Sequence, residues 1–367
     1  MSIIEPIKAQ NMKLSLSIFT ALFFAATTTF AQDGLTYQKP PQEIVDLVDV
    51  PRAPYVLIDE DKENMILLYT DAYKSIEELS KEELRLAGLR IDPSTNIGSR
   101  VRYYNNLEIK RLNEKNAKVM QVKGLPAAPR MTNFSWSADE SKLAFTHTSS
   151  KGVEVWVLDL ATMSAKKLTE ANANANIRGV INWFEDGKSI LVKMVPKDRK
   201  PLINTENSVP TGPTVSENNG KKAQNRTYQD LLKLATSELI KVDLSGGQTP
   251  WLPKNMYTSI SFSPDGEYVM VTTLDRPFSY LVPYYRFPSK TVIYTKDAKM
   301  VETVLVEPLI EDLPQGFMAC QTGKRDFEWR DDRPATLTYK QALDGGDPAN
   351  EVEYRDELFE LGAPFKG

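Results

Sequence analysis

The sequence predicts an all-β protein, a β-propeller built from four-stranded blades. The first observation is a repeat in which an apolar or aromatic residue is followed three positions later by Asp and then by a mainly apolar run. The shortest interval between copies is 47 residues, which matches the roughly 40 to 50 residues of one blade. Copies begin at Ile58, Trp136, Trp183, Phe262 and Trp329. About five blades are therefore visible, and the predicted propeller is incomplete.

The second observation is the turn chemistry inside each copy. Asp-Gly at 186–187 and at 265–266 supplies the backbone dihedrals that tight hairpins need, and Ser-Pro-Asp-Gly at 263–266 is the clearest case. Each copy is therefore predicted to form two short strands joined by a turn. Further outer strands are predicted at Val153–Leu158, Glu238–Val242, Lys290–Tyr294 and Val352–Leu361.

Two insertions explain the longer intervals, one near 75–100 and one near 197–233. In the first, Ser75 with Glu78 and Ser80 with Glu83 each fit a capping box, and the leucines that follow predict a short helix on the sheet surface. These leucines are Leu84, Leu86 and Leu89. In the second insertion, 197–227 is polar and rich in Pro and Gly, which predicts a long mobile loop. One or two helical turns are expected at 228–233.

The N-terminal region has the profile of a signal peptide. An apolar run from Leu14 to Ala26 follows Lys13 and is too short for a comfortable bilayer span, and small residues lead to a cleavage site after Ala31. The expected organisation is a signal peptide at 1–31, an N-terminal extension at 32–57 and a partial propeller at 58–367. We expect a periplasmic or secreted protein with no membrane attachment after cleavage. An uncleaved N-terminal anchor is the alternative.

Composition restricts the chemistry available to the chain. The formal net charge is −4, which provides no excess positive field for a nucleic-acid backbone. One Cys excludes an internal disulfide, and one His excludes the usual multi-histidine metal site. We expect no cofactor, no metal ligands and no nucleic-acid partner.

The two residues most suited to catalysis have structural interpretations. A Ser-His-Asp triad would need His147, but strand alternation places it on the face of Leu143 and Phe145, which favours a packing role. Cys320 could pair with His147 as a nucleophile, yet its apolar neighbours predict a buried thiol. The sequence therefore yields no catalytic, cofactor-binding or metal-binding residue.

Three other sets of residues have both a structural and a functional interpretation. The recurring aspartates suit turns better than a calcium site, because each lies on a separate hairpin. They are Asp139, Asp186, Asp265 and Asp332. The aromatic residues that open the repeats are better explained as wedges between blades than as a ligand cage. The aromatic segment Tyr280–Arg286 is a candidate to face the channel or a catalytic domain.

Several segments resemble the glutamyl endopeptidases, a branch of the prolyl oligopeptidase family of serine peptidases. They occur in order over most of the chain and often lie outside regular strands. These segments are Pro40–Asp49, Leu86–Asp92, Asn96–Arg100, Val209–Pro213, Arg226–Leu232, Arg286–Pro288 and Asp344–Asp347.

The resemblance implies an N-terminal propeller followed by an α/β-hydrolase domain that carries Ser, Asp and His. No G-x-S-x-G nucleophile elbow occurs in the sequence, so that C-terminal α/β-hydrolase domain is expected to be absent from this chain. The expected function is to gate access of peptide substrates to a catalytic domain, with no activity alone and with a separate hydrolase half as a partner. Whether to class the chain as an enzyme is left open. The alternative is a free-standing periplasmic propeller that binds peptides or proteins, similar to TolB.

Overall fold

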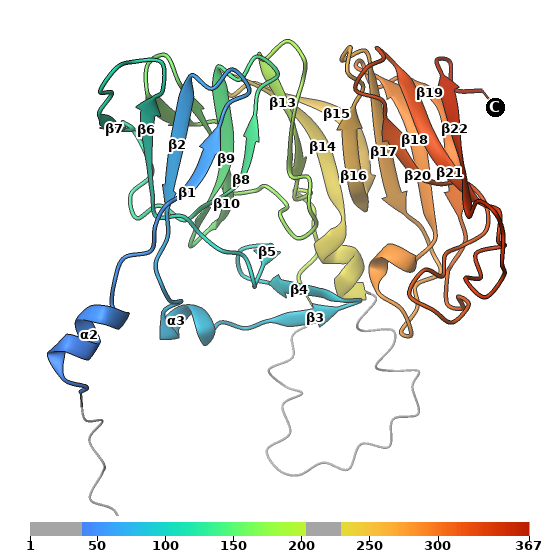
Figure 1. The fold of residues 1–367 in the computed structure, drawn as a ribbon, viewed down its shortest axis with the longest axis horizontal. Coiled ribbons are helices and arrows are strands. Elements are labelled where there is room, and N and C mark those ends of the chain that lie inside the picture. The colour runs from blue at the N-terminus through green and yellow to red at the C-terminus, as the bar shows by residue number, and fades with distance from the viewer. Residues whose placement is uncertain (1–38, 203–228, 367) are drawn as a thin grey trace, which may run out of the picture. The chain divides into compact units, whose positions relative to one another are not determined.

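The computed structural model describes residues 39–202 and 229–366 (Figure 1). The chain divides into two compact units, residues 1–51 and residues 52–367. The described part of the first unit holds helix α2 (Gln42–Val48), none of whose residues is buried. The predicted signal peptide at 1–31 lies outside the described residues. Over the part of the chain that is described, no helix is both long and apolar enough to span a bilayer.

The second unit contains four four-stranded antiparallel sheets and one larger three-stranded sheet, which follow one another in chain order. Sheet 1 comprises β1 (Tyr55–Ile58), β2 (Asn64–Tyr69), β6 (Asn106–Arg111) and β7 (Val119–Gln121). Sheet 2 comprises β8 (Met131–Trp136), β9 (Lys142–Ser149), β10 (Gly152–Asp159) and β11 (Ser164–Lys167). Sheet 3 comprises β12 (Ile181–Trp183), β13 (Ser189–Met194), β14 (Ser237–Asp243) and β15 (Gln248–Asn255). Sheet 4 comprises β16 (Tyr257–Phe262), β17 (Tyr268–Leu274), β18 (Ser289–Thr295) and β19 (Met300–Glu307). Sheet 5 comprises β20 (Arg325–Trp329), β21 (Thr336–Ala342) and β22 (Asp356–Gly362).

The sequence repeat corresponds to these sheets, which confirms the predicted propeller blades. Each repeat begins at the last residue of the first strand of its sheet, and the apolar run is the second strand. The predicted outer strands are third strands, β10, β14, β18 and β22. The fourth strands β11, β15 and β19 lie outside them and were not predicted. They carry largely exposed or half-exposed side chains, so they lack the apolar pattern that identifies the other strands.

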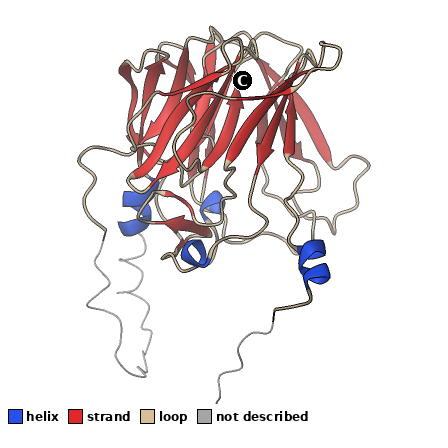
Figure 2. Ribbon diagram, turned by 90° about the vertical axis from the view of Figure 1, so that its left-hand side faces the viewer, coloured by secondary structure: helices blue, strands red, loops and turns tan. Residues whose placement is uncertain are grey.

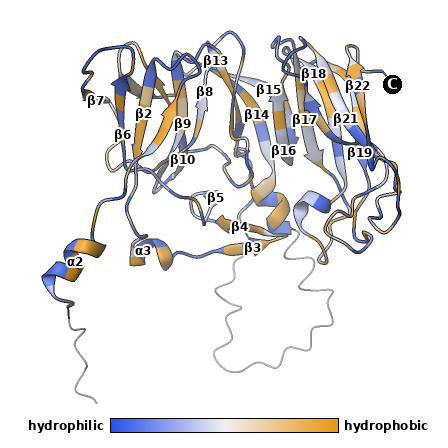
Figure 3. Ribbon diagram, viewed as in Figure 1, coloured by the Kyte–Doolittle hydropathy of each residue, from blue (hydrophilic) through white to orange (hydrophobic). Residues whose placement is uncertain are grey.

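Four apolar clusters fill the spaces between consecutive sheets. Ile66 and Phe145 belong to the cluster between sheets 1 and 2, and Val155 and Trp183 to that between sheets 2 and 3. Equivalent clusters lie between sheets 3 and 4 and between sheets 4 and 5. The apolar stretches of the central strands are visible in Figure 3. Face-to-face packing of successive meander sheets is the architecture of a propeller, and no cluster among the described residues joins sheet 5 to sheet 1, so the propeller is incomplete.

The insertion in sheet 1 differs from its prediction. Helix α3 (Ile76–Leu79) does begin at the predicted cap, because the Ser75 side chain accepts a hydrogen bond from Glu78 N. The leucines that follow do not form a helix. They lie in β3 (Leu84–Leu86) and β4 (Leu89–Asp92), which pair with β5 (Ile97–Gly98) in a small sheet. The predicted cap at Ser80 fails because Ser80 ends α3, so the helix has only one turn.

The insertions of sheets 1, 3 and 4 pack on one another. Leu86 and Ile91 of the small sheet share an apolar cluster with Leu234 and Phe287. Leu234 belongs to a helical segment at 229–235, which agrees with the helical turns expected at 228–233, although residue 228 is not described. Figure 1 shows β3 and β4 beside this segment and beside the short helix η2 (Tyr284–Arg286). The mobile loop predicted at 197–227 lies mostly outside the described residues.

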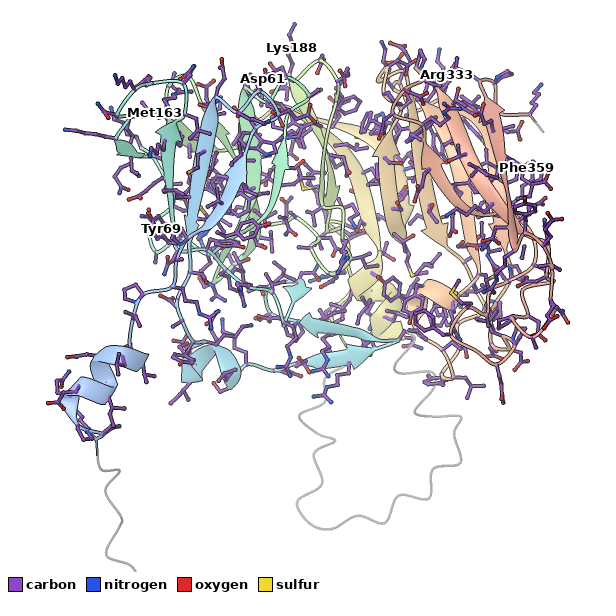
Figure 4. The ribbon with its side chains drawn as sticks, viewed as in Figure 1. Asp61, Tyr69, Met163, Lys188, Arg333 and Phe359 are labelled. Atoms are coloured by element: carbon purple, nitrogen blue, oxygen red, sulfur yellow. The ribbon has the colours of Figure 1, made fainter. Side chains whose placement is uncertain are left out.

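Because strand direction alternates, all of these insertions lie at one end of the blades. That end carries the loops between second and third strands and the connections from sheet to sheet. We call it the loop face, made up of residues 70–105, 195–202, 229–236, 275–288, 308–324 and 343–355. The turns between first and second strands lie at the opposite end, as the labels of Asp61, Lys188 and Arg333 show in Figure 4, with Tyr69 toward the loop face. Figure 2 shows the strands running between these two ends.

Candidate functional site

Three of the four recurring aspartates, Asp139, Asp186 and Asp265, close turns as predicted, whereas Asp332 accepts hydrogen bonds from the Arg330 guanidinium. The Ser137 hydroxyl donates to Asp139 Oδ1 at 2.7 Å and the Ser263 hydroxyl to Asp265 Oδ1 at 2.6 Å. In sheet 1 the equivalent carboxylate is that of Asp59, which follows Ile58 directly. It accepts hydrogen bonds from Glu63 N and from the backbone and side chain of Asn64. Among the described residues, no group of three or more His, Cys, Asp or Glu side chains is arranged to hold a metal ion.

Replacing Asp139 with Ala should lower the free energy of unfolding by about 1 kcal/mol, because the hydrogen bonds that close the turn are lost. Hydrogen bonds from Ser137 and then from Ser141 hold the pKa of Asp139 below its ordinary value. This stabilisation is therefore present at neutral pH and is lost as the pH falls through the lowered pKa. Urea unfolding at several pH values measures it. The matched control is Asp297→Ala, which removes an exposed turn carboxylate that forms no hydrogen bond within the described residues. A rise in Tm on adding Ca²⁺ would contradict the turn role.

The aromatic residues at the ends of the first strands are wedges between blades, as predicted. The Trp183 indole N–H donates to Ser135 O of sheet 2 at 2.9 Å, and the Trp329 indole N–H donates to Ser261 O of sheet 4 at 3.3 Å. Phe262 cannot donate such a bond and packs edge-on against Phe184 of sheet 3, with ring centroids 4.9 Å apart. Each residue therefore joins its own sheet to the preceding one.

His147 lies buried in β9, on the same face as Leu143 and Phe145, where the sequence placed it. Arg130 N–H donates to its Nδ1 at 3.1 Å, and the ring packs edge-on against Trp156. Burial lowers the pKa of His147, which favours the neutral ring that accepts this hydrogen bond. His147 therefore has a structural role, because its ring nitrogen fixes the backbone of Arg130 at the start of β8.

Cys320 is half-buried, which corrects the expectation of a buried thiol. It lies in the connection between sheets 4 and 5, and its N–H donates to Gly346 O at 3.1 Å. That connection is irregular, so the apolar neighbours that suggested burial are themselves partly exposed, and Phe317 is fully exposed. Cys320 and His147 belong to different parts of the propeller, and the structure does not bring them together.

The aromatic segment Tyr280–Arg286 lies on the loop face. Tyr284 N–H donates to Ala87 O at 2.9 Å, which ties the segment to the turn between β3 and β4. Leu281 and Tyr285 are 81% and 70% exposed. A cavity of about 480 Å³ lies between this segment and the turn between β3 and β4, with Arg85 and Leu231 in its lining. The segment therefore presents apolar side chains at the end of the blades that carries the insertions.

Exposed large apolar side chains gather along the same face. They come from four separate stretches of chain, so no local sequence pattern marks them. They are Tyr73, Ile76, Leu79, Leu281, Tyr285, Phe317, Met318, Leu343, Val352 and Tyr354. Several exposed large apolar side chains on one face are a feature of interaction sites.

The relatives of the chain in sequence are peptidases. It is 34% identical over 360 residues to "Probable glutamyl endopeptidase, chloroplastic" of Oryza sativa subsp. japonica, with 90% of the chain and 37% of the relative covered. It is 33% identical over 367 residues to the protein of the same name in Arabidopsis thaliana, with 91% and 37% covered. Among solved structures, Pyrococcus horikoshii acylaminoacyl peptidase matches with a TM-score of 0.42 at 16% identity, covering 86% of the chain and 38% of that structure. No protein-family model matches the chain.

The successive four-stranded antiparallel sheets define the chain as a propeller. Its similarity to glutamyl endopeptidases over 90% and 91% of the chain agrees with the segments that resemble that family. The chain spans 37% of the length of the curated relatives it matches.

Proposed function

We propose that this chain is the propeller part of an exported glutamyl endopeptidase-like serine peptidase. In this proposal an α/β-hydrolase domain docks on the loop face, and the propeller limits which peptides reach it. The observation that carries the proposal is the concentration of exposed apolar side chains on that face. The topology supports it, because the chain enters β1 and leaves each fourth strand at that end of the blades.

Docking can be tested with a hydrolase domain of a glutamyl endopeptidase produced as a separate chain. Leu281→Glu and Phe317→Glu place charges on the loop face at side chains that are 81% and 101% exposed, so the fold should tolerate them. We expect both to weaken association measured by calorimetry. Val306→Glu, on the exposed edge of β19, is the matched control and should bind like the parent chain. Equal binding by all variants would contradict docking on this face.

The purified chain alone should show no peptidase activity. Its sequence contains no G-x-S-x-G elbow, and its only histidine is buried and accepts a hydrogen bond from Arg130 N–H. The measurement is turnover of a glutamyl peptide substrate together with labelling by a serine-directed phosphonate probe. Turnover with stoichiometric labelling would show a catalytic site within these 367 residues and would overturn the proposal.

Export is proposed from the apolar run Leu14–Ala26 and the small residues that follow it. A mature chain that begins at Gln32 when expressed in a bacterium would support export. The second candidate is a free-standing binding propeller similar to TolB. A monomer that unfolds cooperatively and does not bind the hydrolase domain would favour this second candidate.

A further inference from the structure

His147, the single histidine of the chain, is linked through one hydrogen bond to the loop face. In the strand pairing it lies buried opposite Glu154 of β10 and the uncharged Met131 of β8. Its Nδ1 accepts the hydrogen bond from Arg130 N–H, so the proton of the neutral ring is on Nε2. This hydrogen bond exists only while Nδ1 carries no proton.

Arg130 extends this link to the insertion of sheet 1. Its backbone is fixed on both sides, because its N–H donates to His147 and its C=O accepts from Thr148 N–H at 3.0 Å. Its guanidinium lies 4.3 Å from the centre of the Tyr103 ring, and its Nη2 is 3.2 Å from Glu78 Oε1. Glu78 belongs to α3, so Arg130 joins the blades to that helix.

Helix α3 depends on such contacts for its position. No residue of the helix is buried, so it has no apolar core of its own to hold it against the blades. The ion pair between Arg130 and Glu78 is partly buried, which makes it less screened by solvent than a surface pair. The helix also carries Ile76 and Leu79, two of the exposed apolar side chains of the loop face. The arrangement of this part of the loop face therefore depends on where Arg130 is held.

Charges of both signs face the His147 ring. Glu154 favours the imidazolium, but its carboxylate also accepts from the Trp156 indole N–H at 2.9 Å and lies 4.0 Å from Lys167 Nζ. Burial is the largest effect and lowers the pKa of His147, while Glu154 raises it and the like charge of Arg130 lowers it. The ring is therefore neutral at neutral pH and takes up a proton on acidification.

We propose that His147 is a pH-sensitive switch that releases helix α3 when its ring is protonated. A proton taken from water onto Nδ1 converts the acceptor of the Arg130 N–H into a donor and places a positive charge beside the guanidinium. The buried N–H then has no acceptor, and this cost is relieved when residues 129–130 move away from β9. That movement separates Arg130 from Glu78 and frees α3. The inference goes beyond the proposed function, because it concerns a change of shape within this chain.

Nuclear magnetic resonance of the full chain measures the titration directly, because a single histidine gives one set of imidazole signals. Isotope-labelled histidine distinguishes the two neutral tautomers and follows protonation. We expect the Nε2–H tautomer at neutral pH and a pKa below that of a histidine in a peptide. The Nδ1–H tautomer would overturn the proposal, because Nδ1 could not then accept from Arg130 N–H.

The release of α3 is followed with a fluorophore attached at Leu79→Cys in a chain that also carries Cys320→Ser. Leu79 is exposed and Cys320 is the only native thiol, so the fluorophore has one attachment site. Time-resolved anisotropy measures the mobile fraction of the helix. This fraction should rise about fivefold as His147 is protonated, the factor that one net hydrogen bond contributes. A mobile fraction that stays constant across the His147 titration would contradict the switch.

His147→Asn should keep α3 in place on acidification, because the amide oxygen accepts from Arg130 N–H and does not titrate. Protonation of Glu78 would break the ion pair independently of His147, and this variant separates the two causes. If it releases α3 at the same pH as the parent chain does, His147 is not the switch. Thermal unfolding checks that the variant retains the fold.

A second pair of variants tests the coupling without changing the histidine. Glu154→Gln removes the charge that favours the imidazolium and keeps an acceptor for Trp156, so the midpoints of the His147 titration and of α3 release should move together to lower pH. Glu170→Gln is the matched control and should leave both midpoints unchanged, because Glu170 also pairs with Lys167 but is exposed. A release midpoint that stays in place while the titration midpoint moves would refute the coupling. These measurements need no hydrolase domain, so their failure is distinguishable from failure of domain docking.

Discussion

Replacing Trp183 with Ala should lower the free energy of unfolding by about 3 to 5 kcal/mol, the range for loss of a large buried aromatic side chain. The indole is buried in the cluster between sheets 2 and 3, and its N–H donates to Ser135 O of the neighbouring sheet. The change therefore removes both packing area and the hydrogen bond that joins two blades. Urea unfolding followed by far-ultraviolet circular dichroism measures the loss.

Two further variants separate these contributions. Trp183→Phe keeps most of the ring area and loses the N–H donor, so it should cost much less than the alanine change, with about 1 kcal/mol from the hydrogen bond. Trp329→Ala is the matched position in sheet 5, where the indole is only partly buried and its hydrogen bond is longer. We expect a smaller loss there than at Trp183. A loss at Trp183 below that at Trp329 would contradict the wedge role.

The blades could be predicted from sequence because each depends on local physics. The residues between Trp136 and Leu143 contain a strand end, an Asp-closed turn and an apolar strand, all within a few positions. Such a unit repeats visibly even when its copies are separated by insertions. The fourth strands escaped prediction because their stability comes from pairing at the sheet edge and not from a buried face of their own.

The helix predicted for the leucines of the insertion in sheet 1 was wrong because contacts distant in the sequence decide the structure of that segment. Leu84 and Leu86 have the two-residue spacing of a strand, and Leu86 and Leu89 have the three-residue spacing of a helix, so the pattern alone does not decide. The small sheet forms because Leu86 and Ile91 pack against Leu234 and Phe287, far away in the chain. A prediction from local periodicity does not include those contacts.

A cavity of about 620 Å³ on the loop face, lined by five basic side chains, had only a weak signal in the sequence. Arg100 and Arg102 are separated by one residue, but Arg130 comes from the next blade and Lys74 from the other side of the insertion. No short motif contains them, and the net charge of the chain gave no reason to look for a basic site. Their proximity is a consequence of the way the insertion leaves and re-enters sheet 1.

A lysine, Lys193, lies inside the core, and the sequence pattern did not predict it. All six residues of β13 are buried, and Lys193 among them is only 1% exposed. Its Nζ donates to Ile177 O at 2.8 Å and Arg178 O at 2.6 Å, and Tyr257 O lies 3.5 Å away. No carboxylate in the described chain forms an ion pair with it. Burial lowers the pKa of Lys193 to about 7.

The free energy of unfolding should therefore increase with pH above about pH 7, by up to about 1.4 kcal/mol per pH unit. In that range the unfolded chain keeps the proton on Lys193 and the folded chain releases it, so raising the pH favours the folded state. Below about pH 7 both states are protonated and the cost of burying the charge is complete. Urea unfolding from about pH 6 to about pH 9 measures the slope. This pH range lies below the pKa of an ordinary lysine, so other lysines contribute little to it.

Lys193→Met should remove this slope, because methionine fills a similar volume and binds no proton. Lys241→Met is the matched control, since Lys241 lies on the adjacent strand β14, opposite Leu191 of β13, and its Nζ is 4.2 Å from the centre of the Phe184 ring and not buried in the core. That variant should keep the slope of the parent chain. If the parent and both variants show the same dependence on pH, Lys193 is not the titrating group, and the three backbone carbonyls hold it charged throughout the range.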